Sequence, residues 1–190
     1  MSKNNLHVAL SKLRKGQGVM AACTAHPLAI EAVLEHAEKH GIPALIEMEL
    51  HPAFQQPELF DYCVKQNIQP IGFCPIGSPT RPERDKTPDD IAATEIPEII
   101  EIAKARNVHP AVVCLKWAVR RGQIPIPFSI YENEYVSNLR CTTEDPLSDK
   151  EMAILKSVDK NCRLIKGQVF LWEGAKGWED LWDLDGTITK

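Results

Sequence analysis

The chain has 190 residues, of which 44% are hydrophobic and 25% are charged. It carries 22 Lys and Arg against 26 Asp and Glu, which gives a formal net charge of -4. This size and composition predict one globular domain over residues 1–190, and the charge balance excludes a basic footprint for nucleic acid or for an anionic membrane. No apolar stretch is long enough to span a bilayer, and no secretory signal pattern opens the chain, so we expect a cytoplasmic protein.

Strand and helix patterns alternate along the sequence. Strand patterns fall on residues 19–24, 44–50, 69–73 and 124–126. Helical spacing falls on residues 5–15, 27–41, 59–64, 96–103, 110–120 and 148–158. Ser148 and Glu151 form a capping-box pattern at the start of the last helix. The alternation predicts an α/β fold with parallel strands covered by helices.

Two histidines, His26 and His51, each stand between a strand end and a following proline. The carboxyl edge of a parallel sheet is where such folds bind ligands, so a functional role is open for both. A histidine at the start of a helix with no identified carboxylate partner is more often structural. The six cysteines are widely scattered and form no CxxC pair, which favours reduced thiols over disulfides or a zinc site.

Two strand ends carry a more informative pattern. Phe73 closes the third strand and is followed by Cys-Pro-Ile-Gly-Ser, ending at Ser78. An aromatic ring in this position can stack on a flat ligand, and the Gly-Ser turn can offer backbone N–H groups to an anion, although a purely structural turn is an equal alternative. Ser129 follows the fourth strand and precedes a helix, where a phosphate could bind.

Three segments, in this order, resemble the aldo-keto reductase family. MELHPAFQQPELFDYC, starting at Met48, is similar to the family's sixth strand and the helix after it. FCPIGSP, starting at Phe73, resembles its Tyr-Ser-Pro-Leu-Gly-Ser loop, and IPIPFS, starting at Ile124, resembles its Ile-Pro-Lys-Ser strand. The resemblance covers residues 48–190 and implies the C-terminal half of a (β/α)8 TIM barrel.

Residues 1–47 resemble a different family. KLRKGQGVMAACTAHPLAIEA, starting at Lys12, and IPALIE, ending at Glu47, are similar to the opening of the tagatose-bisphosphate aldolase accessory subunits, which are also (β/α)8 barrels. The chain is therefore expected to be a fusion, natural or designed, with its junction between Glu47 and Met48. It would form about half a barrel, whose open sheet edges invite self-association.

The aldo-keto resemblance implies a nicotinamide site on the second half of the barrel. The residues that match the family's cofactor-binding positions are Phe73, Cys74, Ile76, Gly77, Ser78, Ser129 and Asn138. Phe73 matches the tyrosine that stacks on the nicotinamide, residues 74–78 match the pyrophosphate loop, and Asn138 matches an asparagine beside the adenine. Phe128 and Glu134 replace the Lys and Arg that hold the 2′-phosphate, so NAD(H) is expected over NADP(H).

Other family positions are changed or absent. Glu47 stands where the family has a Gln that holds the carboxamide. The catalytic Tyr, Lys, Asp and His lie on the half of the barrel that has no counterpart here, so no residue is assigned as catalytic. Trp172, Trp178 and Trp182 resemble the C-terminal loop that lines the substrate pocket, with core packing as the alternative.

Of three possible functions we expect the first, and the other two are the alternatives. The first is an oxidoreductase by descent, which binds a nicotinamide dinucleotide and a small carbonyl of sugar type but has little turnover. The second is a non-catalytic half-barrel or accessory module that oligomerises. The third is a rearranged product without a stable fold, which would show no cooperative melting.

Overall fold

A computed structural model describes residues 21–23, 27–77, 83, 86–165 and 173–174. The helix predicted over residues 5–15 lies outside these ranges. His26, Ser78, Trp172, Trp178 and Trp182 also lie outside them.

The described strands form one parallel sheet in the order β1-β2-β3-β4. The strands are β1 (Ala21–Ala22), β2 (Ala44–Glu49), β3 (Ile68–Phe73) and β4 (Ile124–Pro125). The helices are α2 (Pro27–His40), α3 (Pro57–Lys65), η2 (Ala93–Glu95), α4 (Pro97–Arg106), α5 (Pro110–Arg121), α6 (Glu132–Arg140) and α7 (Asp149–Ser157). Parallel strands that alternate with helices confirm the predicted partial (β/α)8 barrel.

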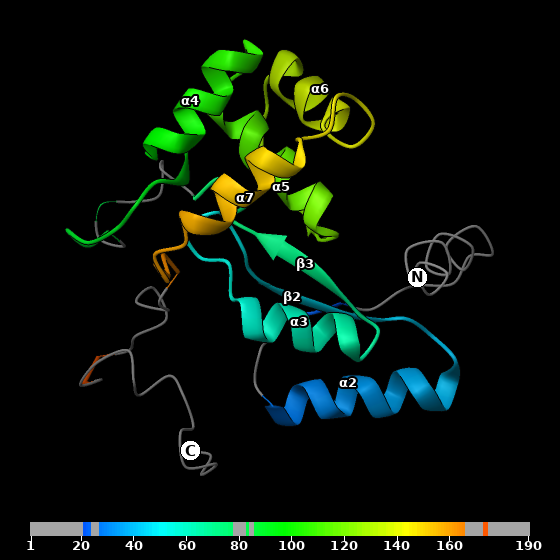
Figure 1. Cartoon of the computed structure of the whole chain (residues 1–190). Helices are drawn as coiled ribbons and strands as arrows, with labels where there is room; N and C mark the ends of the chain where they lie inside the picture. The colour runs from blue at the N-terminus through cyan, green and yellow to red at the C-terminus, as the bar shows by residue number, and fades with distance from the viewer. Residues whose placement is uncertain (1–20, 24–26, 78–82, 84–85, 166–172, 175–190) are drawn as a thin grey trace.

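The strands lie between two groups of helices (Figure 1). Helices α2 and α3 lie on one side, and α4, α5, α6 and α7 gather at the end toward which the β3 arrow points. The expected junction between Glu47 and Met48 falls inside β2, which pairs with β1 on one side and β3 on the other. The two segments on either side of that junction therefore share one sheet.

One face of β2 packs against α2 and α3. Ile46 and Met48 on the strand join Ile30 of α2 and Phe60 of α3 in one buried apolar cluster. Successive side chains of a strand point to opposite faces, so Leu45, Glu47 and Glu49 belong to the other face. The same register places Phe73 on that second face, since it pairs with Glu49 in a parallel ladder.

A second cluster is built by helices α4, α5 and α7. Its buried members include Ile99 of α4, Trp117 of α5 and Leu155 of α7. The predicted capping box is confirmed: the Ser148 side chain accepts from the N–H of Glu151, and the Glu151 carboxylate accepts from the N–H of Ser148. This cap starts α7 in the position where Leu155 enters the cluster.

Arg121, the last residue of α5, lies between the two clusters. Its guanidinium carbon is 3.8 Å from the ring centroid of Phe60 and 5.2 Å from that of Trp117. Burial lowers the pKa of Arg121 to about 10, while Asp61 and Asp159 act in the opposite direction. The two aromatic rings replace part of the hydration that the cation loses, and the contact joins the sheet layer to the helical layer.

Candidate functional site

The turn after β3 carries four of the predicted cofactor-binding residues. Phe73 is half-buried at the strand end, and Cys74 has φ 50°, in the left-handed region. Gly77 has φ 80°, and a Cβ added there would lie 2.7 Å from the backbone nitrogen of Ala93. The Gly77 N–H donates to the Cys74 carbonyl at 2.9 Å and closes the turn. A side chain at residue 77 would push this turn off η2, which explains the glycine.

Ser129 lies on the segment that follows β4, at the same edge of the sheet as the turn after β3. The N–H of Ile126 donates to the carbonyl of Gly72 at 2.9 Å, so the chain that leads to Ser129 starts beside the end of β3. The Ser129 hydroxyl donates to Oε2 of Glu134 at 2.6 Å and accepts from the N–H of Tyr131 at 3.0 Å. A carboxylate is therefore bonded to the hydroxyl that was predicted to contact a phosphate.

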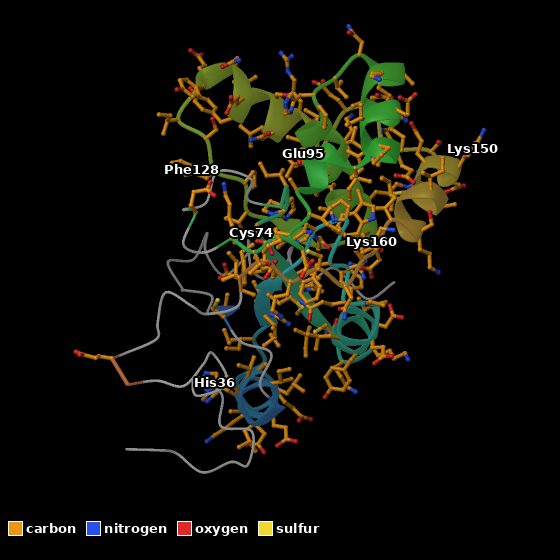
Figure 2. All side chains as sticks on the ribbon, turned by 90° about the vertical axis from the view of Figure 1, so that its left-hand side faces the viewer. His36, Cys74, Glu95, Phe128, Lys150 and Lys160 are labelled. Atoms are coloured by element: carbon orange, nitrogen blue, oxygen red, sulfur yellow. The ribbon has the colours of Figure 1, made fainter. Side chains whose placement is uncertain are left out.

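Phe128 and Asn138 also belong to the segment from the end of β4 through α6. The ring of Phe128 is 87% exposed and lies at the margin of the side-chain layer, whereas Cys74 lies among other side chains (Figure 2). Asn138 is half-buried on α6, and its backbone carbonyl accepts from the N–H of Cys141 at 3.2 Å. The structure thus places Phe73, Cys74, Ile76 and Gly77 in one turn. It places Ser129 and Asn138 on the β4–α6 segment.

Glu47 lies on the same sheet face as Phe73. It pairs in register with Ile71, two residues before Phe73 on the neighbouring strand, and its side chain is half-buried. Cys23 follows β1, the strand that pairs with β2 on the side away from β3. The pKa of its thiol is raised, first by partial burial and then by the charge of Glu47. The Glu47 carboxylate therefore acts on a group at the carboxyl end of β1.

A buried carboxylate at the end of β2 was not found from the sequence. Glu49 is 1% exposed, and its oxygens accept from the backbone N–H groups of Leu164 at 2.7 Å and Ile165 at 3.0 Å. The fully buried His51 donates from Nε2 to Oε1 of Glu49 at 3.1 Å. Burial raises the pKa of Glu49, but these hydrogen bonds outweigh it and hold the pKa below its usual value. The geometry supports a structural role for His51. Its spacing of two residues from Glu49, which places both side chains on one strand face, was the available signal.

The loop after β2 binds the segment after α7 through further contacts. The carbonyl of Ala53 accepts from the N–H groups of Lys160 at 3.1 Å and Cys162 at 3.0 Å. The Gln55 amide donates to the carbonyl of Leu155 at 2.6 Å. A cleft of about 670 Å³ lies between the two segments, and its lining includes Phe54, Gln56, Leu59, Asp159, Asn161 and Arg163. No local pattern in the sequence indicates this cleft, because its two walls are about 100 residues apart in the chain.

No three His, Cys, Asp or Glu side chains in the described ranges are grouped so that they could hold a metal ion. None of the helices in the same ranges has the length and apolar character that crossing a membrane requires. Burial raises the pKa of the Cys114 thiol in α5 to about 12, so this thiol is a core group.

Comparison with known proteins gives a consistent result. The family model described as "Aldo/keto reductase family" matches residues 14–160, a range that begins before Met48 and includes most of the segment 1–47. "Aldo-keto reductase family 1 member A1-A" of Danio rerio is 33% identical over 138 residues, which cover 73% of this chain and 41% of that protein. An aldo/keto reductase of Synechocystis sp. is 32% identical over 142 residues, covering 74% of this chain and 43% of that protein.

The human protein "Aldo-keto reductase family 1 member A1" is 32% identical over 123 residues, covering 65% of this chain and 37% of that protein. The chain therefore spans about two fifths of the length of the curated relatives that it matches.

Proposed function

Because the chain belongs to the aldo/keto reductase family, we propose that it binds a nicotinamide dinucleotide at the carboxyl edge of β3 and β4, as an oxidoreductase module of that family. The observation that carries the proposal is the turn from Phe73 to Gly77. It presents a half-buried aromatic ring at a strand end, followed by a closed turn with two left-handed residues. Such strand ends are where parallel α/β folds bind their ligands.

The residues of this edge fit a dinucleotide in their chemistry. The ring of Phe73 offers a face on which nicotinamide stacks. Cys74, Ile76 and Gly77 offer the backbone of a tight turn to the pyrophosphate. Ser78, which lies outside the described ranges, is proposed for the same contact, and Ser129 and Asn138 offer polar groups from the neighbouring segment. When bound, the nicotinamide supplies hydride chemistry, while these residues bind and orient it.

The second segment favours NAD(H) over NADP(H). Glu134 is hydrogen-bonded to Ser129 at 2.6 Å, so a 2′-phosphate in this position would meet a carboxylate. Phe128, exposed beside it, offers no charge to that phosphate. Repulsion by Glu134 and the missing cation both act against NADPH.

The finer features of the activity are part of the same proposal. The substrate class is a small carbonyl of sugar type, and turnover by this chain alone is low, because no residue of the chain is assigned as the family's catalytic acid. We place the protein in the cytoplasm, treat residues 1–190 as one domain, and retain a fusion near Glu47 and Met48 as the origin of the chain.

Thermal melting with and without cofactor tests the proposal. A ligand at a hundredfold excess over its Kd stabilises the native state by about 2.7 kcal/mol, which raises the melting temperature of a chain of this size by about 5–10 °C. We expect this shift with NADH and a smaller one with NADPH. The matched variant Phe73→Leu should melt close to the original chain but lose most of the NADH shift. A cooperative melt that neither cofactor moves would refute the proposed site.

A second function, a half-barrel that pairs with itself, is favoured by one surface. Large apolar side chains from the end of β4 through α6 are exposed, namely Ile126, Phe128, Ile130, Tyr131, Tyr135 and Leu139. No residue of α6 itself is buried. Within the described ranges no strand pairs with the outer edge of β1 or of β4.

A second copy could bring its β1 beside this β4 as a parallel neighbour and cover the same surface. Sedimentation equilibrium at several concentrations tests this function, and a monomer throughout would contradict it.

A further inference from the structure

Glu47 carries a carboxylate on the strand next to the one that ends in the aromatic ring of Phe73. Both residues lie on the second face of the sheet, on adjacent strands, near the carboxyl edge. The register places Ile71 directly opposite Glu47, and Phe73 is the next residue of β3 on the same face. A flat ring stacked on Phe73 would therefore lie beside β2, where Glu49 is directly opposite Phe73 and Glu47 is its diagonal neighbour on the same face.

The redox state of nicotinamide changes the charge of its ring. In the oxidised dinucleotide the ring is a pyridinium with a positive charge, and in the reduced form it is neutral. The remaining groups of the dinucleotide are the same in both forms. A carboxylate beside the ring therefore interacts differently with the two forms, whereas a neutral amide would distinguish them much less.

We propose that Glu47 makes this chain bind NAD⁺ in preference to NADH. The inference rests on the proposed cofactor site, because it requires the ring to stack on Phe73. Preferential binding of the oxidised form also makes bound NADH a stronger hydride donor than free NADH, since the protein stabilises the product of hydride loss. Glu47 would thus be a specificity-determining residue for the redox state of the cofactor.

The other charged groups near this edge do not produce the same effect. Glu49 is buried and bonded to His51 and to the backbone N–H groups of Leu164 and Ile165, so these donors offset its charge. Glu134 is bonded to Ser129 on the segment that was assigned to the far end of the dinucleotide. In contrast, the Glu47 carboxylate is half-buried, and its charge reaches the neighbouring Cys23 thiol.

Isothermal titration with NAD⁺, NADH and ADP-ribose tests the inference. ADP-ribose lacks the nicotinamide and reports on the rest of the site. We expect NAD⁺ to bind about tenfold more tightly than NADH, since a fixed charge at short range is worth about one decade in affinity. In the Glu47→Gln variant the NAD⁺ to NADH ratio should fall close to one, while the affinity for ADP-ribose stays unchanged.

Glu35→Gln is the matched control. It removes the same charge from the exposed surface of α2, and the NAD⁺ to NADH ratio should stay as in the original chain. The three ligands can be compared in the unmodified chain as well, so the inference does not depend on the folding of one variant. Equal or tighter binding of NADH by the original chain, or an unchanged ratio in Glu47→Gln, would overturn the role of Glu47 and leave the cofactor site standing. If none of the three ligands binds, the proposed site fails and the inference fails with it.

Discussion

The β2 side and the β4 side of the sheet's carboxyl edge differ in how far their side chains are buried and hydrogen-bonded. On the β2 side, Glu49 and His51 are buried, and the segment after α7 closes over them through backbone hydrogen bonds. On the β4 side, α6 buries none of its residues, and Phe128 and Leu139 are 87% and 67% exposed. The β2 side is packed like a protein interior. The β4 side exposes large apolar side chains, as a surface that binds a partner does.

This difference separates the two proposals physically. The proposed cofactor turn, Phe73 to Gly77, starts at the end of β3, next to the buried residues Glu49 and His51. The β4–α6 segment supplies Ser129 and Asn138 but packs little apolar area of its own. We infer that β3 sets the position of the ring and that the phosphate and adenine contacts depend on how firmly α6 is held.

The largest expected effect is the loss of Glu49. Glu49→Ala leaves His51 and the two N–H groups of Leu164 and Ile165 without their buried acceptor. Removing one partner of such a buried set costs about 4 kcal/mol of unfolding free energy. Urea titration measures this loss, and the free-energy difference should appear as a lower midpoint with an unchanged slope.

Glu38→Ala on the exposed surface of α2 is the control for this prediction. It removes the same side chain where no buried donor depends on it, and its cost should stay within about 0.5 kcal/mol. If both variants lose the same small amount, the buried carboxylate does not fix the segment after α7, and the contrast between the two sides loses its basis.

A smaller effect is expected from acid, through the contact between α4 and the start of α7. Arg106 donates to both oxygens of Glu151 at 2.6 Å, and both side chains are mostly buried. Hydrogen bonds from Arg106 and Ser148 lower the pKa of Glu151 from 4.5 to about 2. The folded chain therefore holds this carboxylate charged more readily than the unfolded chain, and the resulting stability is present above pH 4.5 and is lost as pH falls toward 2.

With allowance for solvent screening, this contribution is about 2 kcal/mol. Glu151→Gln should lower the unfolding free energy by this amount at pH 6, and the gap to the original chain should narrow progressively at pH 4 and pH 3. A gap that is constant over this range would show that the cost arises from packing rather than from the charge. The neutral amide keeps the size of the side chain, so the comparison isolates the proton.

The strands and most helices could be predicted because their signals are local. Strand patterns over residues 44–50 and 69–73 match β2 and β3 to within a residue at each end. The Ser148 and Glu151 spacing gave the start of α7, since both halves of a capping box lie within one turn. Phe73 was placed at a strand end for the same reason, by the Cys-Pro-Ile-Gly-Ser sequence that follows it.

What could not be predicted depends on residues far apart in the chain. The donors to Glu49 are 115 and 116 residues away, and no periodicity in either segment indicates that they meet. The bond between Ser129 and Glu134 is local, five residues apart, but the sequence gives no reason to prefer it over a free hydroxyl. The proposed cofactor-binding positions thus came from short motifs that resemble those of a family, whereas their surroundings required the tertiary structure.

The smallest expected effect on stability lies on the β4 side and is the sharpest test of the contrast. Leu139 of α6 is 67% exposed, whereas Leu155 of α7 is fully buried. Leu139→Ala should change the unfolding free energy by less than about 0.5 kcal/mol, because the side chain loses little burial. Leu155→Ala should cost about 3 kcal/mol, because it leaves a cavity among helices α4, α5 and α7.

The Leu139→Ala variant also tests self-association. If a second copy covers the surface formed by Ile126, Phe128, Ile130, Tyr131, Tyr135 and Leu139, then Leu139→Ala should weaken the dimer in sedimentation equilibrium while leaving the stability of the monomer unchanged. A loss of about 3 kcal/mol for Leu139→Ala in a chain that is monomeric would mean that this residue is covered by the chain itself. In that case the chain itself buries the β4 side as it buries the β2 side, and the proposed partner at α6 is contradicted.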